Sequence, residues 1–318
     1  MKTYIFRRLL QAILVLFILS IVIFLVMRLL PGDPILMLIT GDELSQSSEE
    51  RIQALRREFG LDRPLPLQYL SWLKDVLRGD LGTSIVHRDK VEVEIRRRLP
   101  ITIHLGVSAF ALGILLGIPL GIISAVRRGT WWDSIVTFLA NLGITAPPFW
   151  LGVLLIYFLG LYLKLLPIFG YTSPLEDFWM SVRQAIMPVI CLAVYPVAAT
   201  ARQTRSSMLE VIPQDYIRTA WAKGLTERLV IARHALKNAL IPVATLQGII
   251  LRFVLGGSVI VETVFNIPGM GRLAVEAIVA QDYPVVQGVI LVVGIITILI
   301  NLLVDLLYVF LDPRIRYE

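Results

Sequence analysis

The amino-acid sequence predicts an all-α membrane protein that crosses the bilayer six times. Of its 318 residues, 56% are hydrophobic and only 17% are charged, and the mean hydropathy is +0.75. A soluble monomer could not cover so much apolar surface with polar groups, so lipid must be part of the solvent of this chain. The net charge of +6 is not gathered in a polar basic domain, which argues against a nucleic-acid partner.

Six apolar runs are long enough to cross about 30 Å of hydrocarbon as helices. They cover residues 9–27, 101–126, 134–163, 185–200, 239–265 and 285–311. The first run is long and no small-residue cleavage site follows it, so it is predicted to remain as an anchor rather than to be removed as a signal peptide. The fourth run is the shortest, because Pro188 and Pro196 interrupt it and Arg202 and Arg205 end it.

The charges in the short loops predict that both termini are cytoplasmic. With that orientation every inner segment carries Lys or Arg, whereas the short outer segments carry only Lys164, Arg183 and Arg272. An excess of basic residues inside is the usual bias of membrane proteins. The three arginines at 96–98 lie outside. They belong to an outer segment of about seventy residues, and the bias weakens in loops of that length.

That outer segment, residues 31–99, resembles a small soluble domain. A capping box at 47–50 begins an amphipathic helix over 51–59, and the apolar spacing of 69–77 predicts a second helix. Two interpretations stay open. The segment either helps to receive a substrate-delivery protein or only packs over the ends of the spans.

No motif for catalysis or cofactor binding stands out in the sequence. There is no Gly-x-x-x-x-Gly-Lys-Ser/Thr phosphate loop, so the chain has no recognisable means of binding ATP itself. Its three histidines, His87, His104 and His234, lack the spacing of a metal site, and the one cysteine, Cys191, lies in an apolar run. The sequence therefore predicts a non-catalytic chain that binds no cofactor or metal of its own.

A basic segment between the fourth and fifth runs is the most distinctive feature. Residues 216–242 read Tyr-Ile-Arg-Thr-Ala-Trp-Ala-Lys-Gly-Leu-Thr-Glu-Arg-Leu-Val-Ile-Ala-Arg-His-Ala-Leu-Lys-Asn-Ala-Leu-Ile-Pro. Asp215 can cap a short helix, Gly224 supplies a left-handed stop, and Thr226 can cap a second helix. We expect these two short helices to form a compact elbow that a partner protein holds.

This segment resembles the EAA loop of ABC importer permeases, with two residues of the triplet replaced and the glycine at the expected distance. Five flanking motifs agree along nearly the whole chain. They are Leu30-Pro-Gly-Asp-Pro34, Gly79-Asp-Leu-Gly-Thr-Ser84, Val261-Glu-Thr-Val-Phe-Asn-Ile-Pro-Gly-Met-Gly-Arg272, Asp282-Tyr-Pro-Val285 and Asp312-Pro-Arg-Ile-Arg-Tyr317. The pattern is similar to the dipeptide, oligopeptide and nickel branch of the family.

The resemblance implies the six-helix MetI-like fold of type I importers in a prokaryotic plasma (inner) membrane. It divides the chain into an N-terminal transmembrane helix (1–30), the extracytoplasmic segment (31–99), a permease core (100–311) with a cytoplasmic coupling loop (202–241), and a cytoplasmic tail (312–318). The implied partners are a second, similar permease, two ABC ATPase subunits that carry ATP and Mg, and an outer solute-binding protein.

The resemblance also implies alternating access driven through the elbow. ATP binding would draw the ATPases together, the elbow would follow, and the spans would rock so that the cavity opens outward. The candidate contacts to an ATPase are Arg218, Thr219, Ala220, Lys223, Gly224 and Glu227.

Polar residues in the predicted fifth span are the candidates for the translocation pathway. Arg252 falls near the middle of that span, a little beyond Gln247, and an ionisable side chain there is costly unless it faces water or a partner. One hypothesis is that both residues line the pathway and that Arg252 attracts a carboxylate of the substrate. The alternative is that Arg252 snorkels or pairs with a neighbouring subunit.

The segment between the last two spans contains the candidates for an outer gate, Glu262, Pro268, Gly269 and Gly271. The resemblance places this region against the outer mouth, and the plain alternative is a re-entrant or surface helix. Two other patterns predict local structure. Prolines 147 and 148 are expected to kink or unwind the third span, and glycines 113, 117 and 121 make a smooth stripe on the second that packing alone explains.

The predicted substrates, from the family pattern, are dipeptides or oligopeptides, with nickel chelates or glutathione as the alternative. A secondary transporter is the less favoured class, because the sequence shows neither an inverted repeat nor carboxylates near the middle of several spans. A channel would leave the cytoplasmic elbow unexplained.

Overall fold

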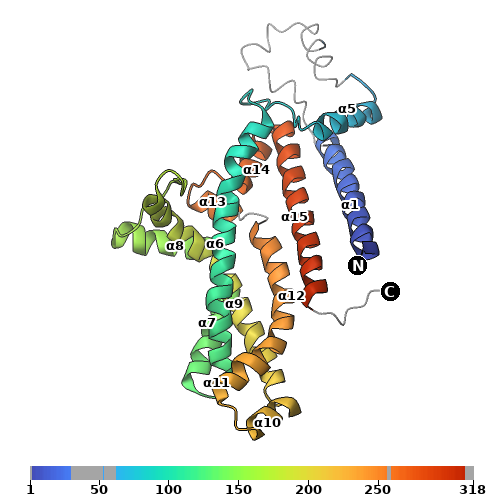
Figure 1. The fold of residues 1–318 in the computed structure, drawn as a ribbon. Helices are drawn as coiled ribbons and strands as arrows, with labels where there is room; N and C mark the ends of the chain where they lie inside the picture. Colours follow the sequence, from blue (N-terminus) through green and yellow to red (C-terminus); the bar gives the residue numbers. More distant parts are fainter. Residues whose placement is uncertain (1, 30–52, 54–61, 256–258, 312–318) are drawn as a thin grey trace. The chain divides into compact units, whose positions relative to one another are not determined.

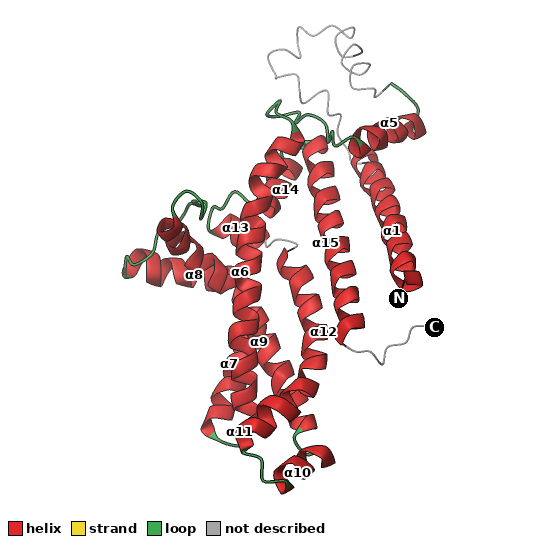
Figure 2. Cartoon of the chain, in the orientation of Figure 1, coloured by secondary structure: helices red, strands yellow, loops and turns green. Residues whose placement is uncertain are grey.

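The structure, a computed structural model, describes residues 2–29, 53, 62–255 and 259–311. Regular structure in this part of the chain is helical, apart from one isolated antiparallel bridge between Thr83 and Lys90 (Figure 2). Among the described residues, five helices are long and apolar enough to cross a membrane, and a bent helix pair makes a sixth if it is counted as one span. The predicted all-α membrane fold is confirmed.

The helices follow one another along the chain as labelled in Figure 1. They are α1 (Lys2–Leu29), α5 (Leu65–Leu77), α6 (Val91–Val126), α7 (Trp131–Thr145), α8 (Pro148–Leu155), the π-helical turn η1 (Ile156–Tyr162), α9 (Phe178–Val211), α10 (Asp215–Ala222), α11 (Glu227–Leu229), the π-helical turn η2 (Val230–Ala235), α12 (Leu236–Leu255), α13 (Val259–Val264), α14 (Met270–Val279) and α15 (Tyr283–Leu311). The second helix predicted in the outer segment is confirmed as α5. The one predicted over 51–59 lies outside the described residues.

The described chain divides into two compact units. The first comprises residues 1–100 and 269–298, and the second comprises 101–268 and 299–318. In the first unit, buried side chains of α1, the start of α6, α14 and the start of α15 form one core. There α5 lies against α1, where Tyr69 and Ser20 share a hydrogen bond of 2.9 Å between hydroxyl oxygens and the rings of Tyr69 and Phe24 meet edge to face.

The second unit is built around the packing of α6, α7 and α12 on α9. A Cβ atom added to Gly117 would lie 2.6 Å from the Cβ of Thr200, and one added to Gly121 would lie 2.5 Å from the carbonyl oxygen of Ala201. Such distances leave no room for a side chain, so the predicted glycine stripe of α6 is confirmed as a packing surface. Cys191, the one cysteine of the chain, is 3% exposed in the larger core of this unit.

The predicted length of the fourth span was wrong. α9 continues for 34 residues through both Pro188 and Pro196 rather than stopping near Thr200. Neighbouring helices and local adjustments re-satisfy the backbone groups that proline frees in membrane helices, so proline is a weak stop signal there.

The third span is bent as predicted at its two prolines. α7 and α8 meet at 105°, with Pro147 immediately before α8 and Pro148 as its first residue. Proline suits the first helical position because that position has no helical partner for an N–H group. The 15 residues of α7 rise by about 22 Å, which is less than the hydrocarbon thickness, so α7 alone is too short to cross.

The predicted fifth span was wrong at its outer end. α12 ends at Leu255 and a separate helix, α13, begins at Val259, so 239–265 is not one helix. Arg252 consequently lies in the last turn of α12 instead of the middle of a span. Hydropathy misses this boundary because α12 and α13 are both apolar.

Candidate functional site

The segment between α9 and α12 folds into an elbow, residues 212–235, at the ends of those two long helices (Figure 1). Its first helix, α10, ends at Ala222, and Gly224 follows with φ of +78°. The Gly224 amide donates to the Trp221 carbonyl at 2.9 Å, as expected for a left-handed glycine just past a helix end. The short helix α11 then leads through η2 into α12. Gly224 ends the first short helix as predicted, but the second prediction was wrong: α11 is continuous with η2 and α12, so Glu227–Val254 is one long helix that follows the glycine.

The predicted helix caps are only partly right. Thr226 occupies the N-cap position of α11, but its side chain makes no capping hydrogen bond. Asp215 is the first residue of α10 rather than its cap, which is Gln214. The Asp215 carboxylate instead lies 3.6 Å from the guanidinium of Arg218, and it still adds a favourable negative charge to the first turn.

One face of the elbow is buried against the ends of three long helices. The buried members of this cluster are Ala125 of α6, Met208 of α9, Ile217 and Ala220 of α10, Val230 and Ala235 of η2, and Ala239 of α12. Packed interiors have few voids and therefore transmit displacement. The elbow is therefore in direct packing contact with α6, α9 and α12.

The opposite face of the elbow is open. Five of the six predicted coupling residues are exposed, namely Arg218, Thr219, Lys223, Gly224 and Glu227. Ala220 is the exception, because it shares the inward face of α10 with Ile217 and is only 6% exposed. It therefore belongs to the elbow core and does not lie on the surface open to a partner.

Two aromatic side chains on this surface were missed by the sequence analysis. Tyr216 is 43% exposed and Trp221 is 40% exposed. The side-chain amide of Asn238 donates to the Tyr216 hydroxyl at 2.8 Å, which fixes the position of that ring. Tyr and Trp are enriched in protein interfaces. The one signal for them in the sequence was the presence of two aromatic residues inside a basic segment.

An ion pair beside the elbow joins α7 to α9. The guanidinium of Arg205 donates to the two carboxylate oxygens of Asp133 at 2.7 and 3.0 Å, and Asp133 is 6% exposed. The Ser124 hydroxyl of α6 donates to the same carboxylate at 2.6 Å, and the Gly129 amide donates at 3.0 Å. The sequence offered no periodicity that could pair residues 72 positions apart.

Two of the quoted motifs meet in the first unit. Asp282 accepts hydrogen bonds from the Ser84 hydroxyl and from the amides of Ile85 and Val86, the latter two at 3.1 and 3.3 Å. Ser84 and Asp282 are 3% and 2% exposed. The two motifs therefore form one buried latch, which holds the 84–86 turn against the start of α15.

The structure does not bring the two pathway candidates together. Gln247 and Arg252 are five positions apart on α12, so their side chains point about 140° away from each other. The Gln247 amide donates to the Thr200 hydroxyl of α9 at 2.9 Å, which is a contact between packed helices. The Arg252 Nε donates to the Gly248 carbonyl of its own helix at 3.2 Å.

The four outer-gate candidates are buried or half-buried. Glu262 is 2% exposed, and its carboxylate accepts a hydrogen bond of 2.8 Å from the Thr102 hydroxyl. Gly269 and Gly271 are buried, and Pro268 is half-buried.

Comparison with known families decides the identity of the chain. The family described as "Binding-protein-dependent transport system inner membrane component" matches residues 117–317, and the corresponding N-terminal family matches residues 1–106. The chain belongs to this family. It is therefore the membrane permease component of a binding-protein-dependent ABC importer, and this family role is that of a non-catalytic subunit.

Curated relatives span the whole length of this permease. A putative peptide transport system permease protein of Brucella abortus (strain 2308) is 45% identical over 318 residues, covering 100% of both chains. The glutathione transport system permease protein GsiC of Pectobacterium atrosepticum is 43% identical, and the dipeptide transport system permease protein DppB of Alkalihalophilus pseudofirmus is 42% identical, again with complete coverage of both chains.

A solved structure supports the predicted fold of the permease. An inward-facing crystal form of the MetNI methionine ABC transporter matches with a TM-score of 0.56 and 21% identity, covering 69% of this chain and 96% of that one. The likeness carries the fold alone. It agrees with the MetI-like type I permease fold that the sequence motifs indicated.

Proposed function

We propose that this permease forms half of the translocation pathway of an importer for dipeptides or oligopeptides. The motifs favour that branch, and relatives named for peptides and dipeptides match this chain from end to end. A relative named for glutathione, itself a short peptide, keeps glutathione as the alternative, together with the nickel chelates of the resembled branch. Membership of the family leaves no support for a secondary transporter.

The elbow carries this proposal. A short helix with one face packed on three long helices and the other face open to solvent is suited to be held by a separate motor subunit. The proposed contacts are Arg218, Thr219, Lys223, Gly224 and Glu227, and we add Tyr216 and Trp221. Ala220 supports them from beneath. ATP and Mg would be bound by two partner ATPases, a second permease would complete the pathway, and a solute-binding protein would deliver the substrate.

The proposed orientation follows from the charges. Both termini and the 202–241 loop would face the cytoplasm of a prokaryotic cell, with the 31–99 segment outside the plasma membrane. This proposal also keeps the domain boundaries at residues 30, 99 and 311. Arg252 is retained as a candidate for binding a substrate carboxylate, and the turn at 268–271 as an outer gate.

Reconstitution tests the proposed function. The complex that co-purifies with this chain, together with its solute-binding protein, is placed in liposomes and supplied with a radiolabelled dipeptide. Uptake should require ATP and should be competed by unlabelled oligopeptide. Competition by glutathione or by a nickel chelate, but not by peptides, would select the alternative substrates. Uptake without any ATPase present would contradict the proposed coupling.

Charge reversal tests the coupling surface. Arg218→Glu combined with Lys223→Glu should release the ATPase subunits from the purified complex, because both side chains lie on the open face of the elbow. Arg202→Glu is the control for reversing an exposed positive charge outside the elbow, since Arg202 is also exposed but lies on α9 before the elbow. Equal loss of ATPase from both variants would refute the assignment of the surface.

A further inference from the structure

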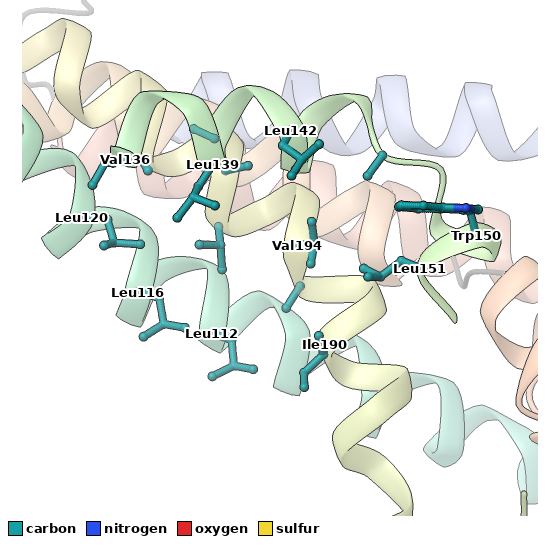
Figure 3. A pocket seen from close by; sticks show the side chains of 17 residues that line it. Leu112, Leu116, Leu120, Val136, Leu139, Leu142, Trp150, Leu151, Ile190 and Val194 are labelled. Atoms are coloured by element: carbon teal, nitrogen blue, oxygen red, sulfur yellow. The ribbon is translucent and has the colours of Figure 1, made fainter. Parts of the chain in front are cut away.

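An apolar groove in the second unit is formed by α6, α7, α9 and the start of α8 (Figure 3). Its volume is about 430 Å³, and all seventeen residues that line it are aliphatic or aromatic, or glycine. Several of these side chains are open at the surface of the unit, because Leu116 is 49% exposed and Leu139 is 56% exposed. A site without polar side chains offers nothing to the charged ends of a peptide, but it suits a hydrocarbon chain.

The two walls of the groove lead to the same basic turn. Leu112, Leu116 and Leu120 repeat every four residues on α6, and Arg127 follows Leu120 by seven residues, which places it on the same face. Helical hydrogen bonding continues to this point, since the Arg127 amide donates to the Ile123 carbonyl at 3.0 Å. Arg127 therefore extends the α6 wall beyond the groove.

The α7 wall of the groove also ends at this basic turn. Trp132 precedes Val136 by four residues and lies on the face of α7 that lines the groove. The Arg127 guanidinium carbon lies 5.9 Å from the centroid of the Trp132 ring, so the two walls touch at this end. Trp131 stacks on Trp132 with ring centroids 4.0 Å apart. Tryptophan is enriched at the level of lipid headgroups.

The turn that joins the walls is fixed by its own hydrogen bonds. Gly129 adopts φ of +78°, and its amide donates to the Asp133 carboxylate. The Thr130 hydroxyl donates to the Arg127 carbonyl at 2.7 Å. Arg127 and Arg128 are both exposed on this turn. These bonds fix the backbone that carries the two arginines, and guanidinium groups bind phosphate oxygens through several N–H donors at once.

The dimensions fit one leaflet of a bilayer. Eleven residues separate Arg127 from Leu116, a rise of about 16 Å along a helix. One leaflet contributes about 15 Å of hydrocarbon. An acyl chain whose phosphate lies at Arg127 would therefore run along the groove past Leu120 to Leu116.

We infer that this turn and groove form a binding site for an anionic phospholipid. The phosphate binds Arg127 and Arg128, the tryptophan pair lies at the headgroup level, and one acyl chain occupies the groove. Charge complementarity favours an anionic over a zwitterionic lipid. Each arginine near a membrane surface contributes about fivefold to the affinity for anionic lipid, so the pair should contribute about thirtyfold.

Native mass spectrometry of the full-length permease, with the subunits that co-purify, tests this inference. The protein is titrated with phosphatidylglycerol and with phosphatidylcholine of the same acyl chains. Wild type should bind phosphatidylglycerol more tightly by at least tenfold. Arg127→Gln with Arg128→Gln should remove that preference, whereas Arg202→Gln should keep it.

A second pair of variants tests whether the acyl chain of the lipid occupies the groove. Leu116→Trp fills the groove and should weaken phosphatidylglycerol binding at least fivefold. Leu115→Trp is the matched control, because Leu115 is 66% exposed and does not line the groove. Three outcomes would overturn the inference: equal affinity for the two lipids in wild type, full preference in the double-arginine variant, or loss of the second permease subunit from Leu116→Trp with unchanged lipid binding. The last outcome would make the groove a subunit interface.

Discussion

Replacing Gly224 with valine should uncouple ATP hydrolysis from uptake. A Cβ atom added at Gly224 meets nothing within 4 Å, so the substitution creates no clash and its effect comes from the backbone alone. The φ of +78° costs a residue with a side chain about 1–2 kcal/mol, and a β-branched residue lies at the high end. That free energy changes the population of the native elbow by about 5- to 30-fold.

The assay measures, in proteoliposomes, the ratio of substrate molecules imported to ATP molecules hydrolysed. We expect this ratio to fall about 5- to 30-fold in Gly224→Val while the subunits stay assembled. Asparagine tolerates the left-handed region better than other residues with side chains, so Gly224→Asn should retain more coupling than Gly224→Val.

Gly79 provides the control. It follows α5 as Gly224 follows α10, has φ of +85°, and also has nothing within 4 Å of an added Cβ. Gly79→Val therefore carries the same backbone cost outside the elbow. An unchanged ratio in Gly224→Val, or an equal fall in both variants, would refute the view that the elbow geometry transmits the motion.

Four further substitutions have expected outcomes. Asp133→Asn should lower the free energy of unfolding, measured by thermal unfolding, by about 2–4 kcal/mol. This is the low end for breaking a buried ion pair, because the Arg205 side chain is 30% exposed. Gly121→Ala should cost about 1–3 kcal/mol in the same assay, since its Cβ would lie 2.5 Å from a backbone oxygen of α9. Asp282→Asn replaces an acceptor of three hydrogen bonds and should speed proteolysis in the 82–90 loop by about tenfold, from a loss of about 1–3 kcal/mol. Arg252→Leu should slow uptake of substrates with a free carboxylate and leave their amides unaffected.

Each of these expectations has a contradicting result. Restored stability is expected when Asp133→Leu is combined with Arg205→Met, and a double variant no better than Asp133→Asn would reject the ion-pair explanation. A Gly121→Ala protein as stable as wild type would show that α6 and α9 separate at little cost. Unchanged proteolysis in Asp282→Asn would argue against the latch. Equal effects of Arg252→Leu on acids and amides would end its proposed role in binding.

Local patterns predicted most of the fold. Hydropathy located every long helix, and the Pro147-Pro148 pair located the bend of the third span. Hydropathy failed at helix boundaries, because helices extend beyond their apolar parts and because α12 and α13 are both apolar. Motif spacing also identified the elbow, since Gly224 needs only local geometry to end α10.

Contacts between distant residues were beyond the sequence analysis. Nothing in a single sequence pairs Asp133 with Arg205, or Ser84 with Asp282, because such pairs depend on how helices pack. The burial of Ala220 could not be predicted for the same reason. Small size suggested a docking contact, but the side on which a small residue packs depends on the neighbouring Ile217 and on Met208 of α9.

The burial of Cys191 makes the native protein suitable for chemical labelling. At 3% exposure in the larger core, its thiol is shielded from water-soluble maleimides, and the sequence contains no second cysteine. Reporter cysteines can therefore be placed one at a time in an otherwise wild-type background. A Thr219→Cys variant that reacts only in inverted vesicles, beside a Leu175→Cys variant that reacts only in intact cells, would map the two sides of the membrane without first removing a native cysteine.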